Sequence, residues 1–253
     1  LRSQAAGRDA NDEIVGRHQK ITTLLETVRR VAQSKATLLI QGESGTGKEL
    51  VARLAHCSSP RAENAFIKVN CAALSEHLLE SELFGHEKGA FTGAIARREG
   101  RFELAHGGTL MLDEVSEISP PLQAKLLRAI EEEELERVGG SRTIKVDVRL
   151  LCTTNRDLAR EVDEGRFRGD LYYRLNVIPI VIPPLRERRE DIPLLVNYFL
   201  KRFRRESASP VRRASREALR ILMRYPWPGN VRELRNVIHR AVVLGASETL
   251  GPA

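Results

Sequence analysis

The sequence predicts an α/β fold in which helices sandwich a parallel sheet of five strands, followed by a smaller α-helical subdomain. Short apolar segments alternate with helical patterns as far as residue 182, and this alternation favours a parallel sheet. Beyond residue 185 the apolar positions keep helical spacing, and no further strand is expected. We therefore predict an α/β subdomain over residues 13–184 and a helical subdomain over residues 185–253, divided after two consecutive prolines.

The composition excludes a membrane protein and a disulfide scaffold. The 253 residues are enough for a sizeable core, 42% are hydrophobic and 30% are charged. No apolar run is long enough to span a bilayer, so we expect a soluble, cytoplasmic protein. Cys57, Cys71 and Cys152 lack zinc-ligand spacing, and we interpret them as reduced, structural thiols. Residues 1–12 are polar and aperiodic, which is typical of the end of a linker.

A glycine-rich segment, GESGTGKE, lies between the apolar strand 37–40 and a helical pattern that starts near residue 50. Its glycines permit positive φ and let backbone N–H groups converge on one anion. A helix N-terminus attracts negative charge, and Lys48 can reach terminal phosphates. The pattern predicts a P-loop for a nucleoside triphosphate. Its residues are Gly42, Glu43, Ser44, Gly45, Thr46, Gly47, Lys48 and Glu49.

Glu49 departs from the general P-loop formula, which has Ser or Thr after the lysine as a magnesium ligand. Thr46 is one replacement for that oxygen. The alternative is a Mg²⁺ ion held mostly by water and a distant carboxylate. The residues leave both alternatives open.

A second apolar strand, in the segment GGTLMLDE, ends in Asp113 and Glu114. This is a Walker B pattern. We expect Asp113 to hold Mg²⁺ through water and Glu114 to polarise the attacking water, the positioning and electrostatic work that phosphoryl transfer needs.

Polar residues also end two other strands, and ligands of open parallel sheets bind at these carboxyl ends. Asn70 follows the strand 66–69 and is expected beside the phosphates, with the capping of a turn as the alternative. Asn155 follows the strand 149–154, so Asn155 or Thr154 is expected near the γ-phosphate or the attacking water.

The segment FGHEKGAFTGA at residues 84–94 interrupts the pattern, because a helix does not tolerate glycines at this spacing. We predict a flexible insertion over residues 84–96 that carries an aromatic ring and a hydroxyl as a contact finger. A buried Phe that anchors an irregular loop is the alternative. The contact residues are Gly89, Ala90, Phe91, Thr92, Gly93 and Ala94. A second insertion, a hairpin, is predicted over residues 135–148 with its turn at Gly139-Gly140.

The C-terminal part combines helices with excess positive charge. Helices are expected over residues 191–205, 215–225 and 230–244, with Asn230 as the cap of the last and Arg232 in its first turn. A cation there opposes the helix dipole, which hints at an anionic partner such as phosphate.

The net charge is +7, and much of the excess lies late in the chain. We interpret it as a solvated helical face or a surface that docks on an acidic neighbour, with direct nucleic-acid binding as the alternative. The residues concerned are Lys201, Arg202, Arg204, Arg205, Arg212, Arg213, Arg216, Arg220 and Arg224.

With these segments placed, the chain resembles the central AAA+ ATPase domain of bacterial enhancer-binding proteins, the activators of sigma-54 RNA polymerase. The resemblance extends from about residue 14 to residue 244. It rests on GESGTGKE, FGHEKGAFTGA, GGTLMLDE, the FR and YYRLNV segments, PPLRERREDI and WPGNVRELRN, which occur in the family's order. GAFTGA is the hallmark that separates this family from other AAA+ proteins, and the family also carries Glu at position 49.

The resemblance implies an ATP- and Mg²⁺-dependent ATPase that forms a ring, expected to be a hexamer. It implies that Asn155 is sensor I, that Asn70 switches the Walker B glutamate, and that Arg168 and Arg174 are arginine fingers given to the next subunit. Arg232 matches sensor II. Ile14 and Val15 are expected either to line a pocket for the nucleotide base or to make a simple core contact.

The same resemblance implies that the GAFTGA loop contacts sigma-54 and that ATP turnover remodels the closed promoter complex into the open complex. Enhancer DNA would be bound mainly through a domain that lies outside this chain, and no membrane partner is expected. Two rival classes are kept: another AAA+ machine, such as an unfoldase or clamp-loader-like ATPase, and a non-enzymatic nucleic-acid-binding module suggested by the basic C-terminal region.

Overall fold

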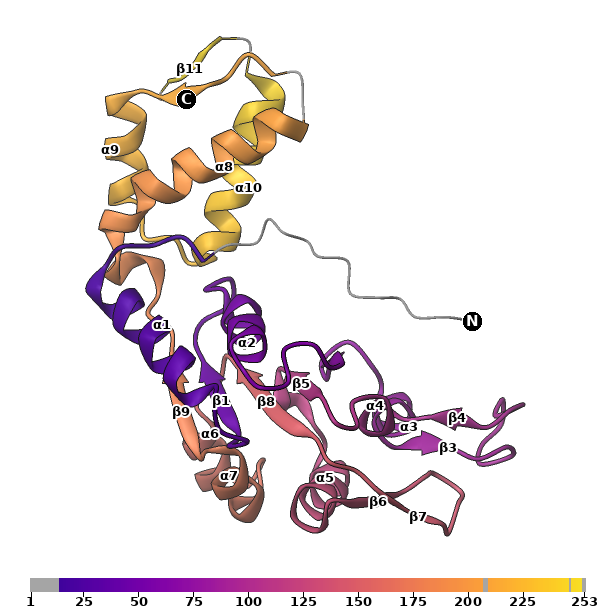
Figure 1. The fold of residues 1–253 in the computed structure, drawn as a ribbon. Coiled ribbons are helices and arrows are strands. Elements are labelled where there is room, and N and C mark those ends of the chain that lie inside the picture. Colours follow the sequence, from indigo (N-terminus) through magenta and orange to yellow (C-terminus); the bar gives the residue numbers. More distant parts are fainter. Residues whose placement is uncertain (1–13, 207–208, 246, 252–253) are drawn as a thin grey trace. The chain divides into compact units, whose positions relative to one another are not determined.

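The computed structural model describes residues 14–206, 209–245 and 247–251, so the expected linker 1–12 lies outside the described residues. The described residues form two compact units. One comprises residues 28–41 and 51–180. The other comprises residues 14–27 and 42–50, together with the described residues from 181 onwards. The colour gradient of Figure 1 follows the chain through both units.

A five-stranded sheet with the order β2-β5-β8-β1-β9 organises the first unit (Figure 1). Its strands are β2 (Phe66–Asn70), β5 (Thr109–Asp113), β8 (Arg149–Thr154), β1 (Leu38–Gln41) and β9 (Ile178–Val181). β2, β5, β8 and β1 pair in parallel, with Asn70 opposite Asp113 and Gln41 opposite Thr154. The predicted α/β fold with a parallel five-stranded sheet is confirmed. The strands end at one common edge, and the chain leaves β1 there to enter residue 42.

Both faces of this sheet are buried, as expected for parallel strands. Leu39, Leu110 and Cys152 belong to a large apolar cluster. It also contains residues of the helices α3 (Glu76–Phe84), α4 (Arg101–Leu104), α5 (Pro120–Glu132), α6 (Leu158–Asp163) and α7 (Gly169–Leu175). The intervening Met111 and Leu151 point to the opposite face and are fully buried as well. The alternation follows from the two-residue period of a strand.

Arg149, at the start of β8, is the largest fully buried side chain of the described residues. Its guanidinium donates to the carbonyl oxygens of Ala32 at 2.7 Å and Ala55 at 3.5 Å. These carbonyls lie at the C-terminal ends of α1 (Gln19–Val31) and α2 (Lys48–Cys57), where cations are favourable. Burial lowers the pKa of Arg149. The arginine thus joins the ends of two helices to the sheet.

Asp147 forms a surface cluster beside Arg149. Its carboxylate accepts two hydrogen bonds from Arg61, at 2.8 and 2.9 Å, and pairs with Lys35 at 2.7 Å. The hydrogen bonds from Lys35 and Arg61 lower the pKa of Asp147 to about 2. The side chain stays 45% exposed, so water screens these pairs.

Helices α8 (Ile192–Glu206), α9 (Arg216–Arg224) and α10 (Asn230–Leu244) build the core of the second unit. Their apolar residues cluster around Trp227, which is buried and donates its indole N–H to the Leu222 carbonyl oxygen at 2.7 Å. The short helices η2 (Leu185–Glu187) and η3 (Arg189–Asp191) precede α8. The predicted helical C-terminal subdomain is confirmed.

Three details differ from the sequence-based expectations. The C-terminal part contains one short strand pair, β10 (Arg213–Ala214) with β11 (Thr249–Leu250), where only helices were expected. Two-residue strands are too short to show period-two alternation. Cys57 is exposed, so the prediction of three structural thiols is wrong at this position, whereas Cys71 and Cys152 are buried. Asn230 is not the cap of α10, because Gly229 occupies the N-cap position.

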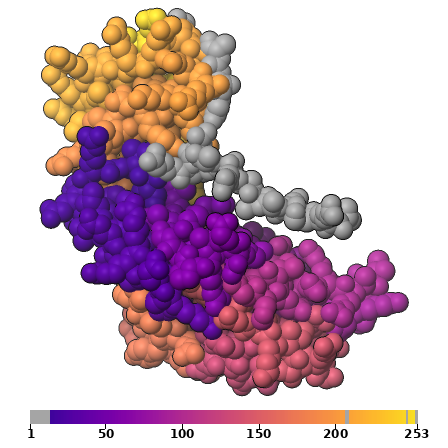
Figure 2. Space-filling model, viewed as in Figure 1, coloured from indigo at the N-terminus to yellow at the C-terminus, as the bar shows by residue number. Residues whose placement is uncertain are grey.

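Two insertions leave the first unit, where the sequence predicts them. Residues 85–100 form a loop closed at its base by β3 (Gly85–His86) and β4 (Arg98–Glu99), and the hairpin β6 (Glu134–Glu136) with β7 (Thr143–Lys145) follows α5. Figure 2 shows the first insertion as a magenta protrusion of its unit. No helix among the described residues is long and apolar enough to cross a membrane.

Candidate nucleotide site

The P-loop has the backbone that its glycines predict. Gly45 and Gly47 have φ angles of +81° and +102°, in the region that glycine adopts without strain. The loop ends where α2 begins, at Lys48. Lys48 is 7% exposed, and its ammonium donates to the Gly42 carbonyl oxygen of the same loop at 2.8 Å. The cation and the helix N-terminus thus lie together, which suits an anionic ligand.

Thr46 is buried, and its hydroxyl donates to the Glu43 carbonyl oxygen at 2.8 Å. This bond uses the hydroxyl hydrogen to close the loop and leaves both lone pairs of the hydroxyl oxygen. The structure therefore assigns Thr46 a part in the loop's own conformation. Its role as a magnesium ligand stays one of two alternatives.

The P-loop is held by residues of the C-terminal helices that belong to the same unit. The carboxylate of Glu43 accepts two hydrogen bonds from Arg186, at 2.6 and 2.8 Å, and one from the side-chain amide of Asn230 at 3.1 Å. These hydrogen bonds lower the pKa of Glu43, so the carboxylate is charged at neutral pH. The second P-loop residue is thereby a structural anchor.

Asn230 is fully buried and acts on the loop from the start of α10. Its amide also donates to the Ser44 carbonyl oxygen at 3.0 Å, and its own oxygen accepts from the backbone N–H of Leu185 at 2.8 Å. The residue has a φ angle of +52°, in the left-handed region that Asn tolerates better than most residues. The buried amide thus links three segments that are distant in sequence.

Arg232 lies where the resemblance places sensor II, next to the P-loop. Its guanidinium donates to the Ser44 hydroxyl at 2.8 Å, and its backbone N–H donates to the Gly45 carbonyl oxygen at 3.2 Å. A Cβ atom on Gly45 would come within 2.2 Å of the Gly229 carbonyl oxygen. Gly45 is therefore required both by its φ angle and by this close approach.

Arg188 and Asp191 are two buried charged residues that the sequence analysis did not single out. Arg188 is 3% exposed and donates to the Thr46 carbonyl oxygen at 3.2 Å. Asp191 is 1% exposed and accepts from the backbone N–H groups of Arg17 and His18, at 2.7 and 3.0 Å. They belong to the segment RERRED, in which nothing distinguishes the buried charges from exposed ones.

These contacts fix the segment that follows Ile14 and Val15. Val15 is half-buried and packs against the apolar cluster of the second unit. The core contact, one of the two alternatives for this segment, is therefore present. The role of Ile14 and Val15 in binding a nucleotide base stays a prediction.

The Walker B carboxylates are held by residues of neighbouring strands. The Thr153 hydroxyl donates to Asp113 at 2.6 Å and accepts from the backbone N–H of Glu114 at 3.1 Å. Lys68 pairs with Asp113 at 3.2 Å. Lys68 and Thr153 were missed because they lie inside strands, where a polar residue looks like part of the alternation.

Glu114 has a φ angle of +57°, which is strained for a residue with a Cβ atom. Its carboxylate accepts from the backbone N–H of Asn155 at 3.0 Å. The expected sensor residue therefore meets the expected catalytic carboxylate at the common edge of the sheet.

Asn70 lies opposite Asp113 in the sheet register. Its side-chain oxygen accepts from the backbone N–H of Ala72 at 2.9 Å, so the turn-capping alternative is realised. The switching role that the resemblance implies stays a prediction, because it requires the side chain to change partners.

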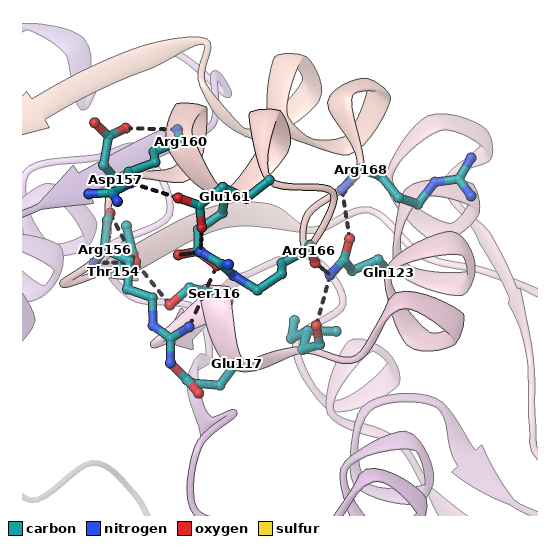
Figure 3. Close-up of polar contacts among 12 residues, drawn as sticks. Ser116, Glu117, Gln123, Thr154, Arg156, Asp157, Arg160, Glu161, Arg166 and Arg168 are labelled. Carbon is teal, nitrogen blue, oxygen red and sulfur yellow. Dashed lines mark hydrogen bonds and ion pairs between the residues drawn. The ribbon is translucent and has the colours of Figure 1, made fainter.

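The segment that carries Arg168 is held by Gln123 of α5, as Figure 3 shows. Gln123 is fully buried; its amide nitrogen donates to the carbonyl oxygens of Ile118 at 2.8 Å and Arg166 at 3.1 Å. Its oxygen accepts from the backbone N–H of Arg168 at 2.8 Å. One side chain therefore fixes the backbone on both sides of residue 167.

A second set of contacts in Figure 3 joins Glu161 to two arginines. Arg166 donates to the Glu161 carboxylate at 2.7 and 2.9 Å, and Arg156 lies 3.6 Å from it. Arg156 also pairs with Glu117 at 2.8 Å. The residues just after β5, just after β8 and just before α7 thus share one polar network.

The two expected arginine fingers are exposed in this chain. Arg168 forms a two-pronged pair with Asp170, at 2.7 and 3.0 Å, in which both side chains are 47% exposed. Water screens such an exposed pair, so it opposes rearrangement only weakly. Arg174 is exposed on α7.

The GAFTGA loop places its aromatic ring at the surface. Phe91 is 42% exposed, and its ring meets that of His86 edge-on at 5.1 Å between centroids. Gly89 and Gly93 have positive φ angles and open space around them. Ala94 is buried. The alternative of a fully buried, anchoring Phe is therefore wrong.

Arg137 joins the base of this loop to the hairpin. It is 6% exposed and pairs with Glu87 at 2.8 Å and with Glu103, which holds it in a two-pronged contact. The hydrogen bond from Arg137 lowers the pKa of Glu103 against the opposing effect of burial. The loop and the hairpin therefore share a buried ionic anchor.

The donor set suits a magnesium ion that shares its ligands with a phosphate. Within the described residues, no three carboxylate, His or Cys side chains gather at a point that could hold a metal. Asp113 supplies one carboxylate, and Mg²⁺ usually binds nucleotides through one or two carboxylates, phosphate oxygens and waters. The residues fit a nucleotide-bound ion and not an all-protein cage.

Comparison with known families decides the assignment. Residues 14–181 match the sigma-54 interaction domain, and residues 186–253 match the AAA+ ATPase lid domain. The chain belongs to the sigma-54 interaction domain family. This membership confirms the resemblance found in the sequence and identifies a transcription-activator AAA+ domain with an ATPase lid.

Curated relatives match over nearly the whole chain. The Nif-specific regulatory protein of Herbaspirillum seropedicae is 58% identical over 244 residues, covering 96% of this chain and 45% of the relative. The transcriptional regulatory protein ZraR of Escherichia coli (strain K12) is 58% identical over 235 residues, covering 93% of this chain and 53% of the relative. The chain thus spans about half the length of the curated relatives that it matches.

Solved structures support the same fold. NtrX from Brucella abortus, in complex with ATP, superposes on this chain with a TM-score of 0.86 at 41% identity. The superposition covers 92% of this chain and 50% of the NtrX chain. Hsp104 matches with a TM-score of 0.65 at 21% identity, and the match covers 93% of this chain and 46% of the Hsp104 chain. At this identity the match supports only the shared AAA+ fold.

Proposed function

We propose that this chain binds ATP with Mg²⁺, hydrolyses it, and uses the turnover to remodel the closed complex of sigma-54 RNA polymerase into the open promoter complex. The proposal rests on the two carboxylates Asp113 and Glu114, which hydrogen bonds from Thr153 and from the backbone N–H of Asn155 hold in place. The same chain has a P-loop with Lys48 at the start of α2. The ATP complex of NtrX supports the choice of nucleotide.

Each residue has a defined task in this proposal. Lys48 and the backbone N–H groups of the P-loop bind the β- and γ-phosphates, and Arg232 adds a second positive charge from the lid. Asp113 holds the waters around Mg²⁺, which when bound neutralises charge on the phosphates. Glu114 accepts a hydrogen bond from the attacking water and orients it, while the Asn155 N–H keeps the carboxylate in place.

Two substitutions separate these tasks. Lys48→Ala should abolish nucleotide binding. Glu114→Gln should retain binding and lose turnover, because an amide oxygen still accepts from Asn155 but no longer polarises water. Equilibrium binding of a fluorescent ATP analogue, together with phosphate release, measures both. A Glu114→Gln protein that fails to bind would contradict this division of roles.

Ring assembly, most simply a hexamer, is part of the proposal because Arg168 and Arg174 are exposed and would act on the nucleotide of the next subunit. An arginine finger contributes on the order of 10³ to 10⁵ in rate. Mixing Arg168→Ala subunits with Glu114→Gln subunits should restore turnover. At some mixed interfaces, one subunit supplies an intact Glu114 and its neighbour supplies an intact Arg168. Absence of any rescue at concentrations where rings form would count against action across subunits.

The GAFTGA loop is proposed as the contact with sigma-54. It carries no group for phosphoryl chemistry, and an aromatic ring such as Phe91 buries roughly 150–250 Å² in a partner. Phe91→Ala and Thr92→Ala should keep basal ATPase and lose capture of sigma-54 in the presence of ADP and aluminium fluoride. Parallel loss of ATPase would mean that the loop is a structural part of the nucleotide site.

Two further parts of the proposal concern organisation. We propose an α/β subdomain over residues 13–184 and a lid over residues 185–253, and limited proteolysis near residues 183–184 would test that division. Enhancer DNA would be recognised mainly by a separate domain, since this chain corresponds to about half of the relatives' length. The rival reading as another AAA+ machine is disfavoured by the family match, and a pull-down of sigma-54 separates the two.

A further inference from the structure

The net positive charge of this chain comes from its C-terminal part. Residues 185–253 contain fifteen Lys and Arg against seven Asp and Glu, a net charge of +8. The preceding 184 residues contain 26 Lys and Arg against 27 Asp and Glu, a net charge of −1. The basic character that suggests a polyanionic partner is therefore a property of the lid alone.

Helix α9 concentrates part of this charge on one exposed face. Arg216, Arg220 and Arg224 recur every fourth residue, and all three are exposed. Arg212 and Arg213, which are also exposed, lie on the segment that precedes the helix. We call these five residues the arginine face. In Figures 1 and 2, α9 forms an outer side of the helical unit.

Carboxylates neutralise this face only weakly. Within the described residues, Arg216, Arg220 and Arg224 form no ion pair. Arg212 is paired with Glu248 at 3.4 Å, but both side chains are more than 60% exposed, so the pair contributes little. By contrast, Arg186, Arg188 and Arg232 of the same unit are occupied by the P-loop.

The spacing of the arginines suits the backbone of a nucleic-acid duplex. Four residues of an α-helix rise about 6 Å, close to the roughly 6.8 Å axial rise between every second phosphate of one DNA strand. A single strand would need exposed aromatic rings for stacking. Tyr225, which follows α9, is 45% exposed and packs edge-on against Trp227 at 5.0 Å between centroids, so it offers a single ring and not a row of stacking platforms.

We infer that the arginine face binds the phosphate backbone of duplex DNA without reading its sequence. The contact is separate from enhancer recognition and from the ATPase cycle, because none of its residues takes part in the proposed nucleotide site. It would hold the lid against DNA near the promoter. Phosphate contacts position a protein but carry no sequence information.

The test measures the salt dependence of binding to a labelled 20-bp duplex of arbitrary sequence, by fluorescence anisotropy, without nucleotide. The variant R216Q/R220Q/R224Q removes three charges from the face. The control R29Q/R30Q/R128Q removes three exposed charges elsewhere. All proteins are first compared by circular dichroism and thermal unfolding, and exposed Arg→Gln changes should leave both unchanged.

Each phosphate contact contributes about 0.9 to the slope of log K against log salt. The α9 variant should therefore lose about three units of slope, and the control should lose none. Between 50 and 200 mM salt, the wild-type affinity should fall about 40-fold more than that of the α9 variant. A second duplex of unrelated sequence should bind equally well.

Two results would overturn the inference. One is an unchanged slope in the α9 variant, which would mean that the face is merely solvated. The other is tighter binding to polyglutamate than to the duplex at equal charge concentration, which would assign the face to an acidic protein partner. Neither result bears on the proposed ATPase, because the assay contains no nucleotide.

Discussion

Replacement of Asn230 by Ala tests the link between the lid and the P-loop. The side chain is fully buried, its oxygen accepts from Leu185, and its amide donates to Glu43 and Ser44. Ala removes these contacts and leaves the buried Leu185 N–H without a partner, a loss of about 1–3 kcal/mol. It also places a Cβ-bearing residue without a compensating side-chain contact at φ +52°, which costs about 1–2 kcal/mol.

We therefore expect the free energy of unfolding to fall by about 2–5 kcal/mol. Trp227 is the single tryptophan of the chain, is buried, and lies three residues from the substitution. Its fluorescence during urea unfolding reports on this unit. ATP affinity should fall as well, because Glu43 and Ser44 lose one of their anchors.

Two further variants separate the backbone from the side chain. Asn230→Gly loses the same hydrogen bonds without the φ penalty, so it should be about 1–2 kcal/mol more stable than Asn230→Ala. Asn236→Ala, at an exposed position of the same helix, should change stability by less than about 0.5 kcal/mol. The reasoning would be refuted if Asn230→Ala unfolded at the same urea concentration as the Asn236→Ala control.

Three other predictions follow from the described contacts. Gln123→Leu should leave ATP affinity unchanged and lower turnover at least tenfold in assembled rings, because the backbone of Arg168 loses its hydrogen bond to the Gln123 side chain. Turnover equal to that of the wild type would show that Gln123 only fills space. Asp191→Ala should lower the free energy of unfolding by about 2–4 kcal/mol, since it leaves the backbone N–H groups of Arg17 and His18 without their acceptor. Exposed Glu190→Ala should have little effect, and equal urea midpoints would contradict this. Asp147 has its pKa lowered from 3.8 to about 2, so its stabilising effect is complete only above about pH 5 and is lost as the pH falls through 3.8 towards 2. In Asp147→Asn the loss of stability over that interval should be smaller, by less than about 1 kcal/mol because the group is half-exposed, and identical acid curves would contradict this.

The sequence was sufficient for the elements whose signal is local. The P-loop, the Walker B strand and the two insertions each have a pattern of glycines or apolar residues within about fifteen positions, and the structure contains them. The boundaries of α8 and α9 differ from the predicted ranges by only one residue at each end.

The sequence was insufficient where a residue's role depends on a distant partner. Asn230 looks like a helix cap because Asn commonly caps helices, but its amide is used by Glu43 and Ser44, far away in sequence. Arg188 and Asp191 stand among other charged residues, and only the fold shows that these two are buried. Cys57 was interpreted as structural because it lacks zinc-ligand spacing, yet its own position faces water.

The anchoring of the P-loop by Asn230 and Arg232 has a consequence for the synthesis of this protein. The sequence separations of these contacts are 186 to 188 residues, so the loop emerges from the ribosome long before its partners do. At about 5–20 residues per second, the interval is on the order of 10–40 seconds. During that time residues 43–45 lack their bonds to Asn230 and Arg232. A nascent or truncated chain without α10 would carry the complete P-loop sequence but not these anchors, so we expect it to bind ATP more weakly than the complete chain.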